Sequence, residues 1–287
     1  MYPMSGKKIQ VNLIDNCKNQ HRSVGTCWGC MSQNPPQEVE AVFDGTGVID
    51  ILHNTQVFQE QIPGYTWHKV LWIREARTIN SRIYDFVRDN HALLFDKGLE
   101  RIYTWDPGLL SLDDRIKWTF GTGSSMKAHE RVLFEKTKRA SMIVRNKTMC
   151  PLHQIRKQAA DALRDVVPIF GSYGSGEIES KLEALRDFRY SFVIENDTSG
   201  TITEKIIDCF VTGTVPIYIG PPLPTHLGFA EEGIICWDLQ TEFNLKMLDE
   251  ARYEEMYPYI VQNYKTALKY LCPPDYMFGH NGFYWND

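Results

Sequence analysis

Short apolar runs alternate with amphipathic segments through the second half of the chain. The apolar runs predict strands at 140–144, 166–170, 190–194, 215–219 and 233–237. The segments between and after them predict helices at 152–163, 179–185, 203–210 and 243–270. Continuous Val/Ile runs separated by helical sequence are typical of a parallel sheet covered on both faces. The second half is therefore predicted to be an α/β lobe.

The first half shows a similar but less regular pattern. Strand-like runs occur at 8–14, 48–52, 69–75, 92–95 and 101–104, and the apolar spacing over 79–87 predicts a helix. The Gly-Thr-Gly-Ser-Ser segment at 121–125 is typical of a linker. These patterns predict an N-terminal α/β lobe at 1–125 and a second lobe at 126–270. A tail at 271–287, rich in aromatic residues, is predicted to pack back on the first lobe.

Composition and charge narrow the class of protein. The 287 residues suit roughly two domains of about 150 residues, and 43% hydrophobic with 23% charged residues is ordinary globular usage. The charge of 31 − 36 = −5 argues against a nucleic-acid partner. The longest apolar runs are shorter than the ~20 residues of a membrane span, so no membrane anchor is predicted. Residues 1–15 show no cleavable apolar core, and seven cysteines are an odd number, which together predict a cytoplasmic protein with free thiols.

The densest cluster of polar residues follows the strand at 190–194. Glu195 and Asn196 end that strand, and a loop of small residues leads to the next helix. Thr201 and Glu204 have the spacing of a capping box, and Lys205 adds a positive charge at a helix end that already carries one. Two interpretations remain open: a phosphate occupies this helix start, or the helix is capped and its lysine is exposed.

A second basic cluster spans 145–156 and also runs from a strand end into a helix. Pro151 suits the first helical position. If the two strand ends are neighbours, Arg156, Lys147 and Lys205 converge on one diphosphate. The alternative is a set of solvated basic side chains on a surface helix.

Cysteine and histidine gather near the N-terminus. Cys17, His21, Cys27 and Cys30 provide four soft ligands within 14 residues. This spacing is open to a zinc site, to a redox pair, or to ordinary thiols in a loop.

Residues 190–220 resemble the donor-binding signature of glycosyltransferase family 10, the α-1,3/1,4-fucosyltransferases. The matching features are Glu195-Asn196, the segment Thr203-Glu204-Lys205, and Gly213-Thr214-Val215-Pro216 before a final glycine. The stretch 141–156 is similar to the family's second signature, which ends in His-x-x-Arg. The resemblance implies a GT-B fold, in which two Rossmann-like lobes face an interlobe cleft and the C-terminal lobe binds a nucleotide-sugar.

The resemblance also implies roles for individual residues. The donor-binding residues are Asn146, Lys147, Arg156, Glu195, Asn196, Thr201, Glu204 and Lys205. Glu75, at the end of the 69–75 strand, resembles the family's catalytic carboxylate; the alternative is an exposed glutamate after a strand. An inverting displacement follows, with Glu75 as general base. No Asp-x-Asp triplet occurs in the chain, so no metal or other cofactor is expected.

Two departures from the family pattern bear on the donor. Asp197 replaces a Ser or Thr, and Thr201 replaces a Tyr, where the donor's sugar and ribose are expected. The whole-chain likeness is closest to glycosyltransferases of large algal DNA viruses, which glycosylate capsid protein in the host cytoplasm, including a chlorella-virus xylosyltransferase. These features favour UDP-xylose as donor and a fucose-containing oligosaccharide or glycoprotein as acceptor. The alternatives are a GDP-fucose-dependent fucosyltransferase, a non-catalytic glycan- or nucleotide-binding protein, and a nucleotide-sugar hydrolase.

Overall fold

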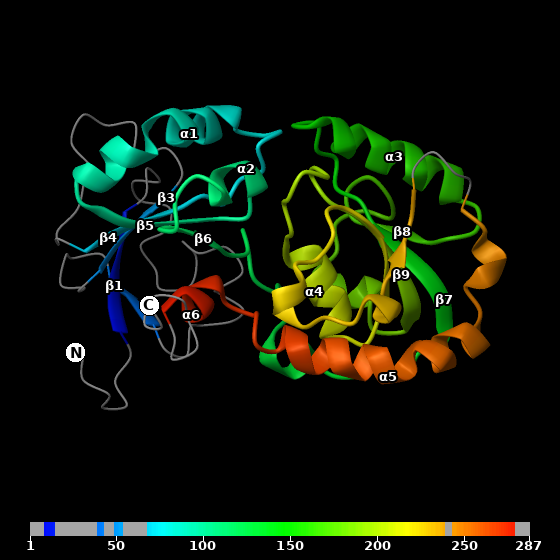
Figure 1. Cartoon of the computed structure of the whole chain (residues 1–287). Helices are drawn as coiled ribbons and strands as arrows, with labels where there is room; N and C mark the ends of the chain where they lie inside the picture. The colour runs from blue at the N-terminus through cyan, green and yellow to red at the C-terminus, as the bar shows by residue number, and fades with distance from the viewer. Residues whose placement is uncertain (1–8, 15–38, 43–48, 54–67, 239–242, 279–287) are drawn as a thin grey trace. The chain divides into compact units, whose positions relative to one another are not determined.

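Two parallel sheets organise the chain. The computed structural model describes residues 9–14, 39–42, 49–53, 68–238 and 243–278 (Figure 1). The chain divides into unit 1, residues 1–123 and 272–287, and unit 2, residues 124–271. Each unit has one sheet, and all strand pairs described are parallel. The α/β class with two parallel-sheet lobes, as expected for a GT-B fold, is confirmed.

Unit 1 contains six described strands in the order β2-β1-β3-β4-β5-β6. Their bounds are β1 Ile9–Ile14, β2 Val39–Val42, β3 Ile49–His53, β4 Lys69–Trp72, β5 Leu99–Thr104 and β6 Ile116–Trp118. The helices of this unit are α1 Ser81–Asp96, α2 Pro107–Leu110 and α6 Pro273–Phe278. The sequence analysis did not predict β2, β6 or α2, which are all short elements.

Helices cover both faces of this sheet. Ile102 on β5 belongs to the hydrophobic cluster that contains the buried residues of α1. The next residue, Tyr103, points to the other face, where its ring lies 6.0 Å from that of Phe278 on α6. Figure 1 shows α1 and α2 on one side of these strands and α6 on the other. The described part of the C-terminal segment is thus a layer of unit 1.

The strand predicted at 92–95 is wrong, because these residues are the last turns of α1. Leu94 and Phe95 are buried in the same cluster as Ile83 and Val87, while Leu93 is 50% exposed. This is the spacing of one helical stripe. The pattern of a four-residue apolar run does not distinguish a strand from a helix. Here α1 begins at Ser81 and continues through these residues.

Unit 2 contains five strands in the order β11-β10-β9-β7-β8. Their bounds are β7 Lys138–Ile143, β8 Ile169–Phe170, β9 Phe188–Ile194, β10 Val215–Ile219 and β11 Ile235–Cys236. The helices are α3 Pro151–Leu163, α4 Glu204–Phe210 and α5 Glu250–Ala267. Short 3-10 turns occur at η3 Ala128–Glu130, η4 Lys181–Ala184, η5 Thr225–Leu227, η6 Glu231–Gly233 and η7 Leu245–Met247.

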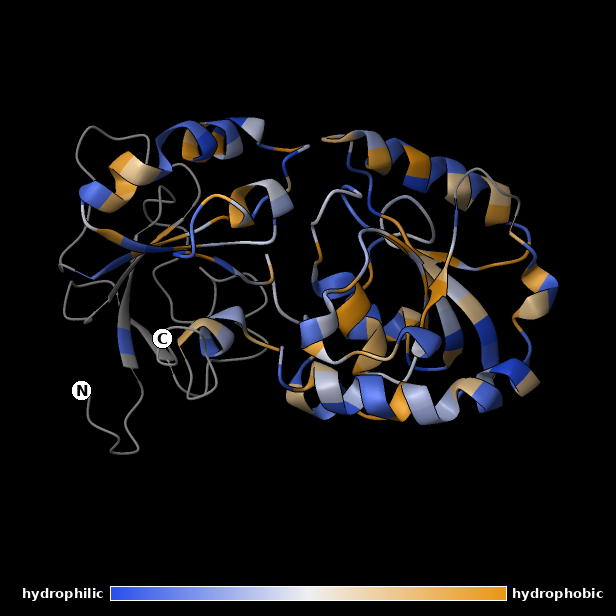
Figure 2. Ribbon diagram, in the orientation of Figure 1, coloured by the Kyte–Doolittle hydropathy of each residue, from blue (hydrophilic) through white to orange (hydrophobic). Residues whose placement is uncertain are grey.

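Two helices predicted in this unit are shorter than expected. The segment 179–185 forms only η4, and 243–270 is divided between η7 and α5. The division occurs at Asp249, whose side chain accepts a hydrogen bond from the Arg252 backbone amide at 2.8 Å and so begins a new helix. In Figure 2, α5 alternates hydrophobic and hydrophilic residues, and Tyr253, Met256 and Ile260 belong to the core cluster of the sheet.

The strand order places a topological switch point in unit 2. After β7 the chain moves to β8 on one side, whereas after β9 it moves to β10 on the other. The carboxyl ends of β7 and β9 are therefore neighbours with diverging connections, the usual ligand position in open α/β sheets. Both basic clusters found in the sequence follow these two strand ends. The sequence analysis expected these clusters to converge if the two strand ends are neighbours, and they are.

Candidate functional site

Arg156 of α3 binds the carboxyl end of β9. The residue is buried, with 7% of its surface exposed. Its Nη2 donates hydrogen bonds to the backbone oxygens of Ile194 and Glu195 and, at 3.3 Å, to Asn196 Oδ1. Its Nε is also buried and has no hydrogen-bond partner among the described residues. The guanidinium thus uses one nitrogen to hold the strand end and retains a second buried donor.

Glu195 is fully buried and organises the start of α4. Its Oε1 accepts a hydrogen bond from the Thr203 backbone amide at 2.9 Å, and its Oε2 accepts one from Thr203 Oγ1 at 2.8 Å. Oε2 also pairs with Lys205 Nζ at 3.0 Å. The Lys205 side chain is 24% exposed. The positive charge of Lys205 near the helix start is therefore offset by Glu195, which neither of the two interpretations above had anticipated.

The predicted capping box of Thr201 and Glu204 is wrong. The helix begins at Glu204, its N-cap is Thr203, and no side chain there makes the capping hydrogen bond. Thr201 Oγ1 instead donates to Asp197 Oδ2 at 2.8 Å, and Asp197 Oδ1 accepts from the Thr201 amide at 3.3 Å. The Asp197 carboxylate, a strong hydrogen-bond acceptor, thus bonds Thr201 and closes the 197–201 loop. Glu204 pairs with Lys181 Nζ at 3.0 Å.

His153 is a member of this site that the sequence analysis did not select. It is 3% exposed and lies one turn before Arg156 on α3. Nδ1 lies 3.0 Å from the Met149 amide nitrogen, and Nε2 lies 3.3 Å from Asn196 Oδ1. Burial lowers the pKa of His153, the charge of Arg156 lowers it further, and Lys147 and Lys205 contribute in the same direction. The i, i+3 spacing with Arg156 in the sequence was a usable signal.

Three cations therefore lie near enough to His153 to lower its pKa: Arg156 on α3, Lys205 on α4 and Lys147 in the loop after β7. Lys147 is exposed, and its ammonium group has no hydrogen-bond or ion-pair partner among the described residues. Asn146 has turned to the surface, where its Oδ1 accepts a hydrogen bond from Lys157 Nζ at 2.6 Å. The site thus brings together Arg156, Lys205, Asn196 and Glu195. Asn146 and Glu204 bond to other lysines at its margin.

Tyr218 closes the other side of Glu195. A Cβ atom added to Gly220 would lie 2.4 Å from Tyr218 Oη and 2.9 Å from Glu195 Cγ, so the glycine gives the ring its space. Tyr218 Oη is buried without a hydrogen-bond partner among the described residues. Burial, followed by the charge of Glu195, raises the pKa of Tyr218 well above its ordinary value, so the phenol remains a neutral donor. Tyr218 Oη and Arg156 Nε are thus two buried donors near Glu195 that have no hydrogen-bond partner among the described residues.

Glu75 lies in unit 1, just after β4, and is exposed. Its carboxylate has no hydrogen-bond or ion-pair partner among the described residues, whereas its backbone oxygen accepts a hydrogen bond from Tyr84 Oη. The preceding residue, Arg74, stacks on Trp72 with its guanidinium carbon 4.8 Å from the ring centroid. The backbone at this strand end is thus held while the carboxylate reaches solvent.

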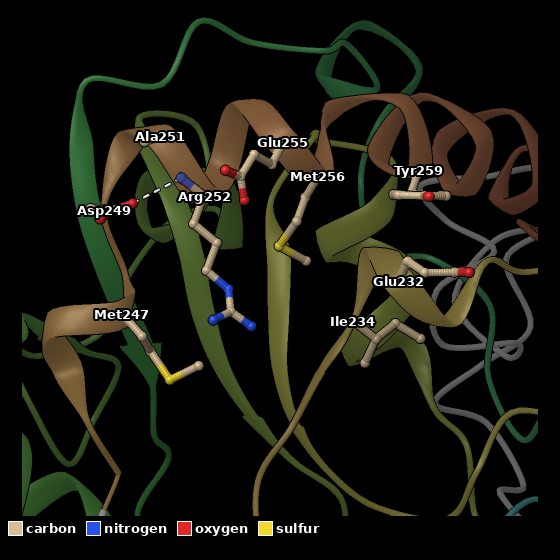
Figure 3. Close-up of a pocket in the computed structure, with 9 residues that line it drawn as sticks. All are labelled: Glu232, Ile234, Met247, Asp249, Ala251, Arg252, Glu255, Met256 and Tyr259. Carbon is tan, nitrogen blue, oxygen red and sulfur yellow. Dashed lines mark hydrogen bonds between the residues drawn. The ribbon is translucent and has the colours of Figure 1, made fainter.

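A second feature of unit 2 is a pocket of about 570 Å³ beside α5 (Figure 3). In Figure 3 the Arg252 guanidinium points into it between Met247 and Met256. Three carboxylates share the lining with this one cation. The lining residues are Glu232, Ile234, Met247, Asp249, Ala251, Arg252, Glu255, Met256 and Tyr259. Its excess of negative charge is unfavourable for a diphosphate, and it contains none of the predicted donor-binding residues.

Other predictions concern metals, thiols and membranes. Within the described residues, no group of three or more His, Cys, Asp or Glu side chains is placed to hold a metal ion. Cys17, His21, Cys27 and Cys30 lie outside the described residues. Among the described residues, Cys150, Cys209 and Cys236 are free thiols. No helix in the described part is both long and apolar enough to cross a bilayer.

Comparison with known proteins identifies a related segment. No family model matches the chain. A putative fucosyltransferase-like protein of Arabidopsis thaliana is 34% identical over 80 residues, and an α-(1,3)-fucosyltransferase of Helicobacter pylori is 35% identical over 79. A quarter of the chain is similar to fucosyltransferases. The matched segments cover 25% of this chain but only 15% and 16% of these relatives.

Two crystal structures align with almost the whole chain. Crystal structures of α1,3-fucosyltransferase with GDP and with GDP-fucose are 14% and 15% identical to it, with TM-scores of 0.46 and 0.43. Each alignment covers 94% of this chain and 84% of the other.

Proposed function

We propose that this protein is a glycosyltransferase that moves a sugar from a nucleoside-diphosphate donor to a hydroxyl group of a glycan. The observation that carries the proposal is the group of cations at the adjoining carboxyl ends of β7 and β9. Arg156 forms hydrogen bonds with Glu195 and Asn196, and Lys205 forms an ion pair with Glu195. Lys147 is close enough to lower the pKa of His153, which contacts the same Asn196. The segment similarity to fucosyltransferases supports the same function.

In this proposal the cations hold the diphosphate. Arg156 offers Nε, which has no hydrogen-bond partner among the described residues, and the side chain of Lys205 is partly exposed. Glu195 acts through Lys205, because it is fully buried and bonded to Thr203 and Lys205. Asn196 contacts the donor directly, whereas Thr201 shapes the loop through Asp197. Asn146 and Glu204 lie at the margin, where a bound donor would draw them from their lysine partners.

The reaction that follows is a single inverting displacement. Glu75 removes the proton from the acceptor hydroxyl as its oxygen attacks the anomeric carbon, and the bond to the diphosphate breaks. The negative charge that grows on the leaving diphosphate is stabilised by Arg156 and Lys205. This role requires unit 1 to present Glu75 to a donor held by unit 2. The carboxylate of Glu75 has no partner in the described part of the chain, which suits a general base.

Two donors are compatible with the proposal. UDP-xylose is compatible with the departures at Asp197 and Thr201, whose side chains bond to each other. GDP-fucose fits at least as well, because the relatives with segment similarity are named as fucosyltransferases. The acceptor is proposed to be an oligosaccharide or a glycoprotein glycan.

The test is thermal unfolding with UDP, GDP, UDP-xylose and GDP-fucose. A nucleotide at a hundredfold excess over its dissociation constant is expected to stabilise the folded chain by about 2.7 kcal/mol. Stabilisation by UDP and UDP-xylose alone identifies uracil as the base of the donor, and stabilisation by GDP and GDP-fucose alone identifies guanine. If none of the four raises the unfolding temperature at millimolar concentration, the donor site is absent and the proposal fails.

Replacing Glu75 by glutamine separates an enzyme from a binding protein. Glu75→Gln is expected to lower sugar transfer by about 100-fold or more, the usual contribution of a general base, and to leave nucleotide affinity unchanged. Glu100→Gln, the same chemical change elsewhere in unit 1, is the control and should retain transfer. Full transfer activity in Glu75→Gln would remove Glu75 from the mechanism, and sugar release without an acceptor would indicate a hydrolase instead.

A further inference from the structure

The tautomer of His153 is determined by its two neighbours. The Met149 backbone amide can only donate, so Nδ1, at 3.0 Å from its nitrogen, must accept this hydrogen bond. The ring hydrogen is therefore on Nε2, which lies 3.3 Å from Asn196 Oδ1 and donates to it. A protonated ring would lose the bond from Met149 and add a positive charge beside Arg156, Lys147 and Lys205. Burial, which lowers the pKa of His153, agrees with a neutral ring.

Asn196 receives a second donor on the same oxygen. Arg156 Nη2 lies 3.3 Å from Asn196 Oδ1. Neither His153 nor Arg156 presents an acceptor at this position, so the oxygen of the amide, and not its nitrogen, faces them. The Nδ2 group consequently faces away from both residues. With its oxygen held by His153 and Arg156, the Asn196 amide presents only an N–H donor to a ligand, so it binds an acceptor and not a donor.

We propose that His153 is a positioning residue of the donor site, which holds the amide of Asn196 so that its Nδ2 donates to a diphosphate oxygen. The proposal rests on the function proposed above. Arg156 supplies the second contact to the same amide oxygen and at the same time provides Nε for the diphosphate. His153 itself touches no ligand; it acts through Asn196, 43 residues further along the chain.

Two substitutions separate this role from a purely structural one. Asparagine at position 153 can place an acceptor where Nδ1 lies, which keeps the bond from Met149, but it is too short to replace Nε2. Glutamine can place an N–H donor where Nε2 lies, which keeps the bond to Asn196, but it does not reproduce Nδ1. His153→Asn thus loses only the contact to Asn196, and His153→Gln loses only the contact to Met149.

The measurement is the dissociation constant of UDP or GDP, whichever binds the unmodified chain, with unfolding temperature recorded without ligand. His153→Asn is expected to weaken binding by about tenfold, the size of one lost hydrogen bond. His153→Gln should restore most of that affinity. In an Asn196→Ala background, His153→Asn should have no further effect on affinity, because the group it positions is gone.

Three results overturn the inference. Unchanged affinity in a folded His153→Asn variant shows that the histidine does not position a donor contact. A larger loss in His153→Gln than in His153→Asn assigns its role to the Met149 loop. A tenfold loss that persists in the Asn196→Ala background excludes Asn196 as the intermediary. If the unmodified chain binds neither nucleotide, the proposed function fails first, and this inference falls with it.

Discussion

Replacing Arg156 by lysine is expected to lower the kcat/KM of sugar transfer by about 100- to 1000-fold. The substitution keeps the charge but not the fork of the guanidinium, and lysine cannot bond the end of β9 and a diphosphate in separate directions. In the structure one nitrogen of Arg156 contacts Ile194, Glu195 and Asn196, while Nε has no hydrogen-bond partner among the residues that the structure describes. Loss of one preorganised contact to developing charge typically costs ~2.7–4 kcal/mol of transition-state stabilisation.

The measurement is steady-state kinetics with the nucleotide-sugar that stabilises the unmodified chain. Arg164→Lys is the matched control, since Arg164 is the C-cap of the same helix, is 47% exposed, and contacts Asp161 and the ring of Tyr173. The control should remain within twofold of the unmodified enzyme. Thermal unfolding without ligand separates loss of the site from loss of the fold. A folded Arg156→Lys variant with full turnover would exclude Arg156 from the diphosphate site.

The largest effect on stability is expected at Asp208. Asp208→Asn should lower the free energy of unfolding by about 3–5 kcal/mol, the usual cost of removing one partner from a buried ion pair. Asp208 is 1% exposed and pairs with Lys181 Nζ at 3.0 Å. Its Oδ1 also accepts hydrogen bonds from Ser124 Oγ and the Ser125 amide, each at 2.8 Å. An asparagine amide nitrogen would face at least one of these donors.

Urea unfolding of the whole chain, followed by tryptophan fluorescence or circular dichroism, measures this change in the free energy of unfolding. Asp161→Asn is the control, because the Asp161–Arg164 pair is about half exposed on both sides and contributes roughly 0–1 kcal/mol. Equal unfolding midpoints for the two variants would show that the Asp208 network does not stabilise the unit.

The Asp208 network also explains where unit 2 begins. The sequence predicted a linker at 121–125 from its glycines and serines, and the boundary between the units does lie between Gly123 and Ser124. Ser124 is nevertheless fully buried, since its hydroxyl is bonded to Asp208 on α4, 84 residues away. Composition predicts a linker here, and the fold shows that two of its serines are bonded to Asp208.

The elements around the candidate site were predictable because their signals are local. For α3, β9 and β10, apolar period, a proline at the first helical position and bounding polar residues gave limits within two residues of those observed. The α1 segment shows the limit of such signals. Its last apolar run had the composition of a strand, and the burial of Leu94 and Phe95 against the sheet decides the helix.

By itself, the sequence determined that two α/β lobes form and that basic residues follow two strand ends, because periodicity and residue order are properties of the chain alone. Tertiary structure decided which of these residues meet. Glu195 pairs with Lys205, and Asp197 bonds to Thr201, which therefore does not cap the helix. His153 and Asn196, 43 residues apart, meet because β7 and β9 are neighbours. Such pairings depend on strand order, which the packing of the whole core selects and no local pattern encodes.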